Sequence, residues 1–236
     1  MRDAIRRFGV LAAITLLIGA GVQVLMPSPA AASSTICKGE QIPTGYVAVA
    51  QGSSSACPGS FPNTWTITLP SPSGTTMCKG PTVVPDRYVI IAQGSSTACP
   101  GSFPNTWTIH RPSTTAPSSM CKVSPYPEAY VITAEGSSTA CPGSFPNTWT
   151  IAPGLGTITV CSVSPLRAFH VVTAQGNSMS CPGSYPNTWT VQRPPSTGVT
   201  VVCKVSPLPE YFEVIGTTNS SSCSGGSPNA KRIQRV

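Results

Sequence analysis

The stretch Cys-Pro-Gly-Ser-Phe-Pro-Asn-Thr-Trp-Thr-Ile runs from Cys57 to Ile67. It returns letter for letter at residues 99–109 and 141–151. The repeat unit is about 41 residues long, so the fold depends on what stabilises one such unit. The total length of 236 residues, which would otherwise suggest one or two ordinary domains, therefore says little about the architecture.

Two further copies depart from this pattern. The fourth copy differs only by Tyr185 and Val191. The fifth copy, at residues 223–233, keeps the cysteine and the Pro-Asn pair at the same offsets but has Ser227 and Lys231 in place of the two aromatic residues. We interpret the fifth copy as a polar capping repeat rather than as a fifth binding unit.

The composition and the N-terminus indicate export. Charged residues make up only 9% of the chain, which contains 21 Gly and 26 Pro. Three arginines within the first seven residues precede an apolar run at 10–18 and a small-residue site at 30–32, which is typical of a secretory signal peptide. We expect residues 1–32 to be this signal peptide, with an uncleaved membrane anchor over 8–26 as the alternative.

The charge pattern excludes some partners. Beyond residue 32 the chain has 11 basic and 6 acidic residues, and the basic ones are scattered except near the C-terminus. Nucleic-acid binding usually requires a clustered basic surface, so we expect no nucleic-acid partner. We also expect no stable membrane insertion once the signal peptide is cleaved, and a location that is secreted, periplasmic or at the cell surface.

Ten cysteines follow the signal peptide, an even number in a chain expected to be exported, which favours disulfides. Zinc is poorly supported because no two cysteines lie closer than 20 residues and the chain has only two histidines. We expect no metal and no cofactor. Pairing each cysteine with its neighbour leaves no cysteine over. Shifting the pairing by one would leave Cys37 and Cys223 unpaired at opposite ends of the chain. The expected bridges are Cys37–Cys57, Cys78–Cys99, Cys121–Cys141, Cys161–Cys181 and Cys203–Cys223.

Each repeat predicts three short strands: one that runs into the first cysteine, one that begins at an aromatic position such as Tyr46, and the alternating Asn-Thr-Trp-Thr-Ile segment. The predicted fold is an all-β, elongated tandem array of five small disulfide-stabilised β-modules. A stacked β-rod or a small propeller is the alternative. Length variation falls mainly in Pro/Ser/Thr-rich segments, which we interpret as semi-stiff connectors between modules. The expected boundaries are 33–74, 75–116, 117–156, 157–198 and 199–236 for repeats 1 to 5.

Two sets of aromatic residues are candidates for ligand binding. Exposed aromatic rings stack on sugars, and a tandem array would add avidity. For the strand tryptophans we favour a core position instead, because Trp65 and Ile67 share one strand face. The loop aromatics, between cysteine and strand, are better contact candidates. The two sets are Phe61, Phe103, Phe145 and Tyr185 in the loops, and Trp65, Trp107, Trp149 and Trp189 in the strands.

The sequence contains no paired carboxylates and no nucleophile beside a base, so we predict a non-enzymatic protein. The leading hypothesis is multivalent adhesion or binding outside the cell, with an extracellular polysaccharide or a surface protein as the partner. A tandem secreted protease inhibitor is a second hypothesis, since such inhibitors present rigid disulfide-tethered loops. A purely structural surface spacer is a third.

Overall fold

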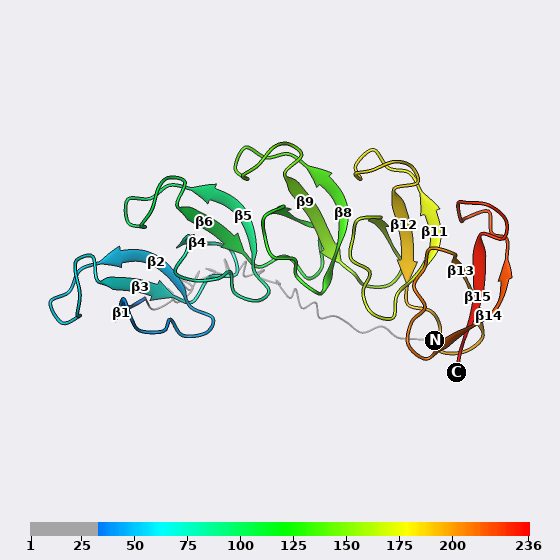
Figure 1. Ribbon diagram of the computed structural model, residues 1–236, viewed down its shortest axis with the longest axis horizontal. Coiled ribbons are helices and arrows are strands. Elements are labelled where there is room, and N and C mark those ends of the chain that lie inside the picture. Colours follow the sequence, from blue (N-terminus) through cyan, green and yellow to red (C-terminus); the bar gives the residue numbers. More distant parts are fainter. Residues whose placement is uncertain (1–32) are drawn as a thin grey trace, which may run out of the picture. The chain divides into compact units, whose positions relative to one another are not determined.

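The computed structural model describes residues 33–236, so the expected signal peptide lies outside the described residues. Within the described part every regular element is a β-strand, and no helix there is long and apolar enough to cross a membrane. The strands form five antiparallel three-stranded sheets, one for each repeat, as the sequence predicts. We number these sheets modules 1 to 5 in chain order (Figure 1).

Each module contains its three strands in the spatial order first, third, second, so the Trp-bearing third strand lies in the centre of the sheet. The first strands are β1 (Ser34–Cys37), β4 (Thr75–Cys78), β7 (Ser118–Cys121), β10 (Ile158–Cys161) and β13 (Val199–Cys203). The second strands are β2 (Val47–Gly52), β5 (Val89–Gly94), β8 (Tyr130–Gly136), β11 (Val171–Gly176) and β14 (Phe212–Thr218). The third strands are β3 (Thr64–Thr68), β6 (Thr106–His110), β9 (Thr148–Pro153), β12 (Thr188–Gln192) and β15 (Ala230–Arg235).

One disulfide closes each module by joining the end of its first strand to the loop between its second and third strands. All ten cysteines are paired, in the order expected from the sequence, and each bridge encloses a separation of 20 or 21 residues. A loop of this length restricts the unfolded chain by about 3 kcal/mol in the chain-entropy estimate. A sheet of three short strands needs such a covalent bridge because it buries little apolar surface by itself.

The modules pack directly against one another. The interpretation of the variable segments as semi-stiff connectors between separate modules is therefore wrong. The second strand of each module lies beside the first strand of the next (Figure 1). At each of these edges two buried side chains belong to one hydrophobic cluster. Insertions are tolerated because exposed loops such as 114–117 accommodate them away from these contacts. The buried pairs are Val47 and Met77, Val89 and Met120, Val131 and Val160, and Val171 and Val202.

A β-bulge in each second strand supplies the polar contacts between modules. In β5, an edge strand, the register shifts between Ile90 and Ala92, and the contacts to module 3 come from amides on either side of this shift. The Ile90 amide donates to Ser124 Oγ of module 3 at 2.9 Å, and Gln93 N donates to the Ala140 carbonyl at 2.8 Å. Serines of modules 4 and 5 repeat the first contact, so the stacking is specified by hydrogen bonds as well as by apolar packing.

The disulfides of modules 3, 4 and 5 also cover the hydrophobic sheet face of the preceding module. Cys121 and Cys141 of module 3 belong to the cluster that contains Ile90 and Ile109 of module 2. Cys141 Sγ lies 3.6 Å from the carbonyl oxygen of Ile91, the bulge residue. The core of this protein is therefore shared between neighbouring modules.

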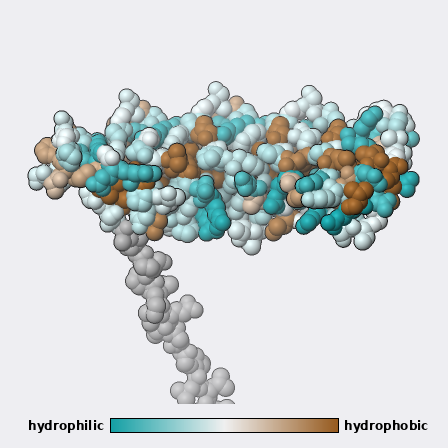
Figure 2. Space-filling view, turned by 60° about the horizontal axis from the view of Figure 1, so that its bottom comes forward, coloured by the Kyte–Doolittle hydropathy of each residue, from teal (hydrophilic) through white to brown (hydrophobic). Residues whose placement is uncertain are grey.

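Module 5 ends this series with an exposed outer strand. In β14 the position of the buried valines is occupied by the exposed Glu213, while Val214 and Ile215 are 44% and 40% exposed. Figure 2 shows hydrophobic side chains gathered at this end of the molecule, where Val201 and Leu208 are also exposed. The outer edge thus combines one charge with apolar side chains and is less polar than a capping repeat predicts.

Candidate functional site

A buried asparagine fixes the loop between the second and third strands in every module. Asn63 is 2% exposed, and its Nδ2 donates to the carbonyl oxygens of Ser54 at 2.9 Å and Cys57 at 2.7 Å. Its Oδ1 accepts the Ser54 amide at 2.9 Å. The sequence repeats this asparagine at a fixed offset, but its role becomes visible only in the structure. The same three contacts are made by Asn105, Asn147, Asn187 and Asn229.

The Cys-Pro-Gly-Ser segment forms the turn that opens this loop. Gly59 has a φ of 93°, as the third residue of a type II turn requires. Its counterparts in modules 2 to 4 have φ between 90° and 93°. A side chain there would meet no atom within 4 Å, so the backbone conformation and not space selects glycine. The turn, the disulfide and the asparagine together give the loop a defined shape.

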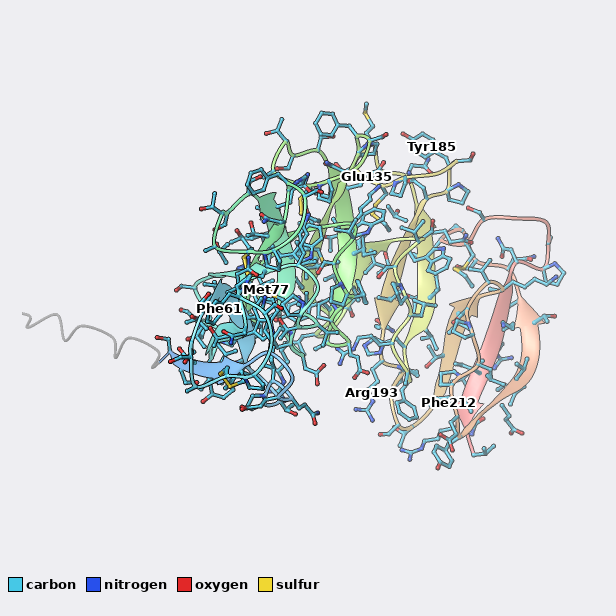
Figure 3. The ribbon with its side chains drawn as sticks, turned by 60° about the vertical axis from the view of Figure 1, so that its left-hand side comes forward. Phe61, Met77, Glu135, Tyr185, Arg193 and Phe212 are labelled. Atoms are coloured by element: carbon cyan, nitrogen blue, oxygen red, sulfur yellow. A yellow bond between two sulfur atoms is a disulfide. The ribbon has the colours of Figure 1, made fainter. Side chains whose placement is uncertain are left out.

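The loop aromatics stand out from this framework. Tyr185 projects from the loop at one end of module 4, opposite the end that carries Arg193 (Figure 3). Each of the four side chains is followed by a cis proline. In Figure 1 the loops of modules 2 to 4 leave their sheets on the same side. The exposed fractions are 65% for Phe61, 60% for Phe103, 60% for Phe145 and 58% for Tyr185.

The strand tryptophans are half-buried. Three of them, Trp107, Trp149 and Trp189, pack against the hydrophobic clusters of the modules. A lysine that follows the first cysteine covers the ring in modules 1 to 3. The distances from lysine Nζ to the ring centroid are 4.4 Å for Lys38, 3.7 Å for Lys79 and 4.1 Å for Lys122. The sequence signal for this contact is the lysine one residue after the cysteine, which our sequence analysis did not use.

Hydrogen bonds hold these lysines over the rings. Lys122 Nζ forms a 3.0 Å ion pair with Glu135, and Lys38 Nζ donates to Gln51 at 2.9 Å. Lys79 Nζ donates to the Pro104 carbonyl at 2.9 Å, and burial lowers the pKa of its ammonium group. Because a cation already occupies the outer ring face in modules 1 to 3, the tryptophans are less available for ligand stacking there than the loop aromatics.

Two grooves lie between consecutive modules at the end of the sheets away from the loops. Groove 1, of about 970 Å³, is lined by modules 1 and 2 and includes Tyr46, Trp65 and Tyr88. Groove 2, of about 660 Å³, is lined by modules 2 and 3 and includes Tyr88 and Tyr126. Burial raises the pKa of Tyr126, while a hydrogen bond with Ser164 and the charge of Arg167 act in the opposite direction. The sequence did not predict these grooves, because they form only where two modules meet.

The other titratable residues of the described part lie on several modules. In residues 33–236 no three His, Cys, Asp or Glu side chains lie close enough together to hold a metal ion. His110 occupies a position on β6 where burial lowers the pKa of the imidazole, partly offset by a hydrogen bond with the backbone of Ser119. Its Nε2 is buried without a partner among the described residues. The acids Asp86 and Glu128 lie on the rims of the grooves.

No protein-family model, curated protein or solved structure matches this chain. A function for this chain therefore has to be inferred from its own geometry. Ten paired cysteines indicate an oxidising environment, and repeated disulfide-bonded β-modules fit an extracellular repeat protein. The loop aromatics and the intermodule grooves are the surfaces on which a binding function can be built.

Proposed function

We propose that this chain is an exported, non-enzymatic repeat protein that binds an extracellular partner through its loop aromatics, with several modules engaged at once. The observation that carries this proposal is the repeated presentation of Phe61, Phe103, Phe145 and Tyr185, each 58–65% exposed on a loop held by the same asparagine contacts. A folded protein exposes large aromatic side chains at equivalent places most readily where they contact something else.

Rigid presentation supports binding for a thermodynamic reason. A loop that is already ordered loses little conformational entropy when a partner docks, and a two-dihedral aromatic side chain adds little more. Four modest contacts on one chain then reinforce one another, because each engaged module raises the effective concentration of the next. A partner with a repeated surface, such as a polysaccharide or a polymeric surface protein, suits this arrangement best.

The test is a co-sedimentation assay of the oxidised protein with insoluble cellulose, chitin, peptidoglycan and collagen. Binding to one of these is expected to fall by tenfold or more in the quadruple variant F61A/F103A/F145A/Y185A, and in smaller steps when one aromatic is removed at a time. The matched control, V123A/L155A/V163A/V205A, removes four exposed apolar side chains from other places and should leave binding unchanged.

Two outcomes would contradict the proposal. Equal binding by the quadruple variant and its control would remove the loop aromatics from the site. Failure to bind any of the four materials, in a protein that resists proteolysis when oxidised, would favour the structural spacer.

A further inference from the structure

Groove 1 has the walls of a peptide-binding groove. Tyr46, Trp65 and Tyr88 line it from two modules, and prolines such as Pro43 and Pro85 supply much of the remaining surface. Tyr88 is held in place because its hydroxyl donates to the Pro70 carbonyl at 2.7 Å. Aromatic rings separated by proline ridges form the type of surface on which extended, proline-rich segments dock.

The groove is acidic as well as aromatic. Its lining, which lies entirely within the described part of the chain, includes the exposed carboxylates Glu40 and Asp86 but neither Lys nor Arg. Lys38 covers the ring of the lining residue Trp65, so the rings of Tyr46 and Tyr88 form the accessible aromatic wall. Groove 2 differs on this point, since Arg87 and Arg111 accompany its acids Asp86 and Glu128. The charge of groove 1 is therefore complementary to a cationic ligand, and that of groove 2 is balanced from within.

An arginine side chain of the chain itself lies at the corresponding contact between modules 3 and 4. In each module the amide at the start of the second strand donates to a turn carbonyl three residues earlier, from Tyr88 to Pro85 at 3.1 Å and from His170 to Arg167 at 3.1 Å. Arg167 thus takes the place of Pro85. Its Nη1 donates to the Gly154 carbonyl at 2.7 Å, and its charge acts on Tyr126 of module 3. Gly154 is equivalent to Pro70 of module 1, so the Arg167 guanidinium makes the contact that the Tyr88 hydroxyl makes in groove 1.

An oligosaccharide suits this surface less well. A sugar carries a hydroxyl group on most carbons. Polar residues such as Glu40 line part of the groove and would bond some of these hydroxyls, but Ile42, Leu69 and Val84 offer the others no partner. A polyproline II segment has an apolar surface of its own and loses little conformational entropy on binding. We propose that groove 1 binds an extended, proline-rich peptide segment that carries arginine, with the guanidinium between the aromatic wall and the carboxylates of Glu40 and Asp86.

Isothermal titration calorimetry with the oxidised protein tests this site. The probe is the acetylated, amidated peptide (Pro-Pro-Arg)₃-Pro-Pro, and the comparison peptide has glutamine in place of every arginine. We expect the arginine peptide to bind at least about tenfold more tightly, and its affinity to fall as salt is raised, because the carboxylates and the guanidinium attract each other through solvent. Chitohexaose serves as the saccharide probe.

Substitutions in the protein separate the site from the fold. Pro85→Arg copies the turn of module 4 and is expected to fill groove 1 with a guanidinium and reduce peptide affinity by tenfold or more. The double variant E40Q/D86N should reduce affinity roughly three- to tenfold. Glu210→Gln, at the position in module 5 equivalent to Asp86, is the matched control and should have no effect. Intact disulfides and an unchanged far-UV spectrum would show that each variant is folded.

Three results would overturn the inference: equal binding of the arginine and glutamine peptides, unchanged affinity in the Pro85→Arg variant, or binding of chitohexaose without binding of the arginine peptide. The site is separate from the loop aromatics on which the proposed function rests. The F61A/F103A/F145A/Y185A variant is therefore expected to bind the arginine peptide normally, so that failure of one proposal leaves the other standing.

Discussion

Modules 3 and 5 have the same strand order and the same disulfide, but their outer edges differ. Val131 on β8 is 3% exposed and packs against module 4, whereas Glu213, at the same position on β14, is exposed. The bulge residue Thr133 has its carbonyl 3.7 Å from Cys181 Sγ of the next module, whereas its counterpart Ile215 is 40% exposed. The fold of a module is thus compatible with an outer edge that packs against a neighbour and with one that is exposed.

A second difference lies inside the sheet. Gly136 pairs with Thr148 in module 3, and a Cβ on that glycine would lie 3.0 Å from Thr148 Oγ1. Module 5 has Thr218 paired with the buried Ala230 at these positions. The larger and the smaller side chain have changed strands, so the space between them stays filled. Local packing rules therefore hold in both modules even though their edges differ.

Placing the charge of module 5 inside the array tests the first difference. Val131→Glu buries a carboxylate at the contact with Val160. The Arg167 guanidinium lies beside this position but already donates to the Gly154 carbonyl, so the lost hydration is poorly compensated and modules 3 and 4 should be destabilised by about 3–5 kcal/mol. Val131→Ala, which only removes packing, should cost about 2 kcal/mol. Hydrogen exchange of the β8 and β10 peptides, read by mass spectrometry, reports the local loss of stability.

The reverse substitution is the control. Glu213→Val lies at the exposed edge and should change stability by less than about 0.5 kcal/mol. Equal effects of Val131→Glu and Val131→Ala would show that the contact between modules admits water, and the edge residue would then not distinguish an inner module from an end module.

The disulfides test whether burial in the shared core stabilises a module beyond the effect of a bridge on the entropy of the unfolded chain. The Cys37–Cys57 and Cys121–Cys141 bridges both span 20 residues, so each should stabilise its module by about 3 kcal/mol through the unfolded chain. Only the second covers the sheet of a preceding module. C121A/C141A should therefore destabilise more than C37A/C57A in denaturant titrations, and should also expose module 2 to exchange. Equal losses would mean that the sulfur atoms contribute nothing to the contact.

A double-mutant cycle tests the exchange of side-chain sizes. Gly136→Ala places a methyl group against Thr148 Oγ1 and should cost about 1–3 kcal/mol. Thr148→Ala, which copies Ala230, should recover part of that loss when the two are combined, giving a coupling energy of about 0.5–3 kcal/mol. Additive effects, measured by chemical denaturation, would show that the pair is not in contact.

Much of this fold could be predicted from the sequence, because local rules produce it. The cysteine series predicts the bridges, the Pro-Gly pair predicts the turn, and alternation predicts the three strands. The exposed state of Phe61 also agrees with its place in a loop between Ser and Pro. These features depend on residues within about 20 positions of one another in the chain.

The contacts between modules could not be predicted in this way. Val47 and Met77 lie in different repeats, and nothing in the alternation of either strand shows that they share a buried cluster. The same limit applies to groove 1, which needs Tyr46 and Tyr88 from two repeats. The variable segments suggested semi-stiff connectors because sequence length alone does not show that an insertion loops away from the interface.

His110 provides the smallest of these tests. It lies at the end of β6, where Thr68, Ala152 and Gln192 stand in the other modules. Burial lowers the pKa of its imidazole below 6.5, so the unfolded chain takes up a proton at a pH where the folded chain does not. Stability from this group is present above pH 6.5 and is lost as the pH falls from there toward the lowered pKa.

We therefore expect the denaturation midpoint of the wild-type protein to fall between pH 7 and pH 5, and this fall to be smaller in His110→Gln. Glutamine suits the site because Gln192 occupies the same place in module 4, where it accepts a hydrogen bond from Thr157 Oγ1 at 3.0 Å. An unchanged pH dependence in His110→Gln would contradict this prediction. It would show that water reaches the His110 imidazole although β6 lies in the interior of the array.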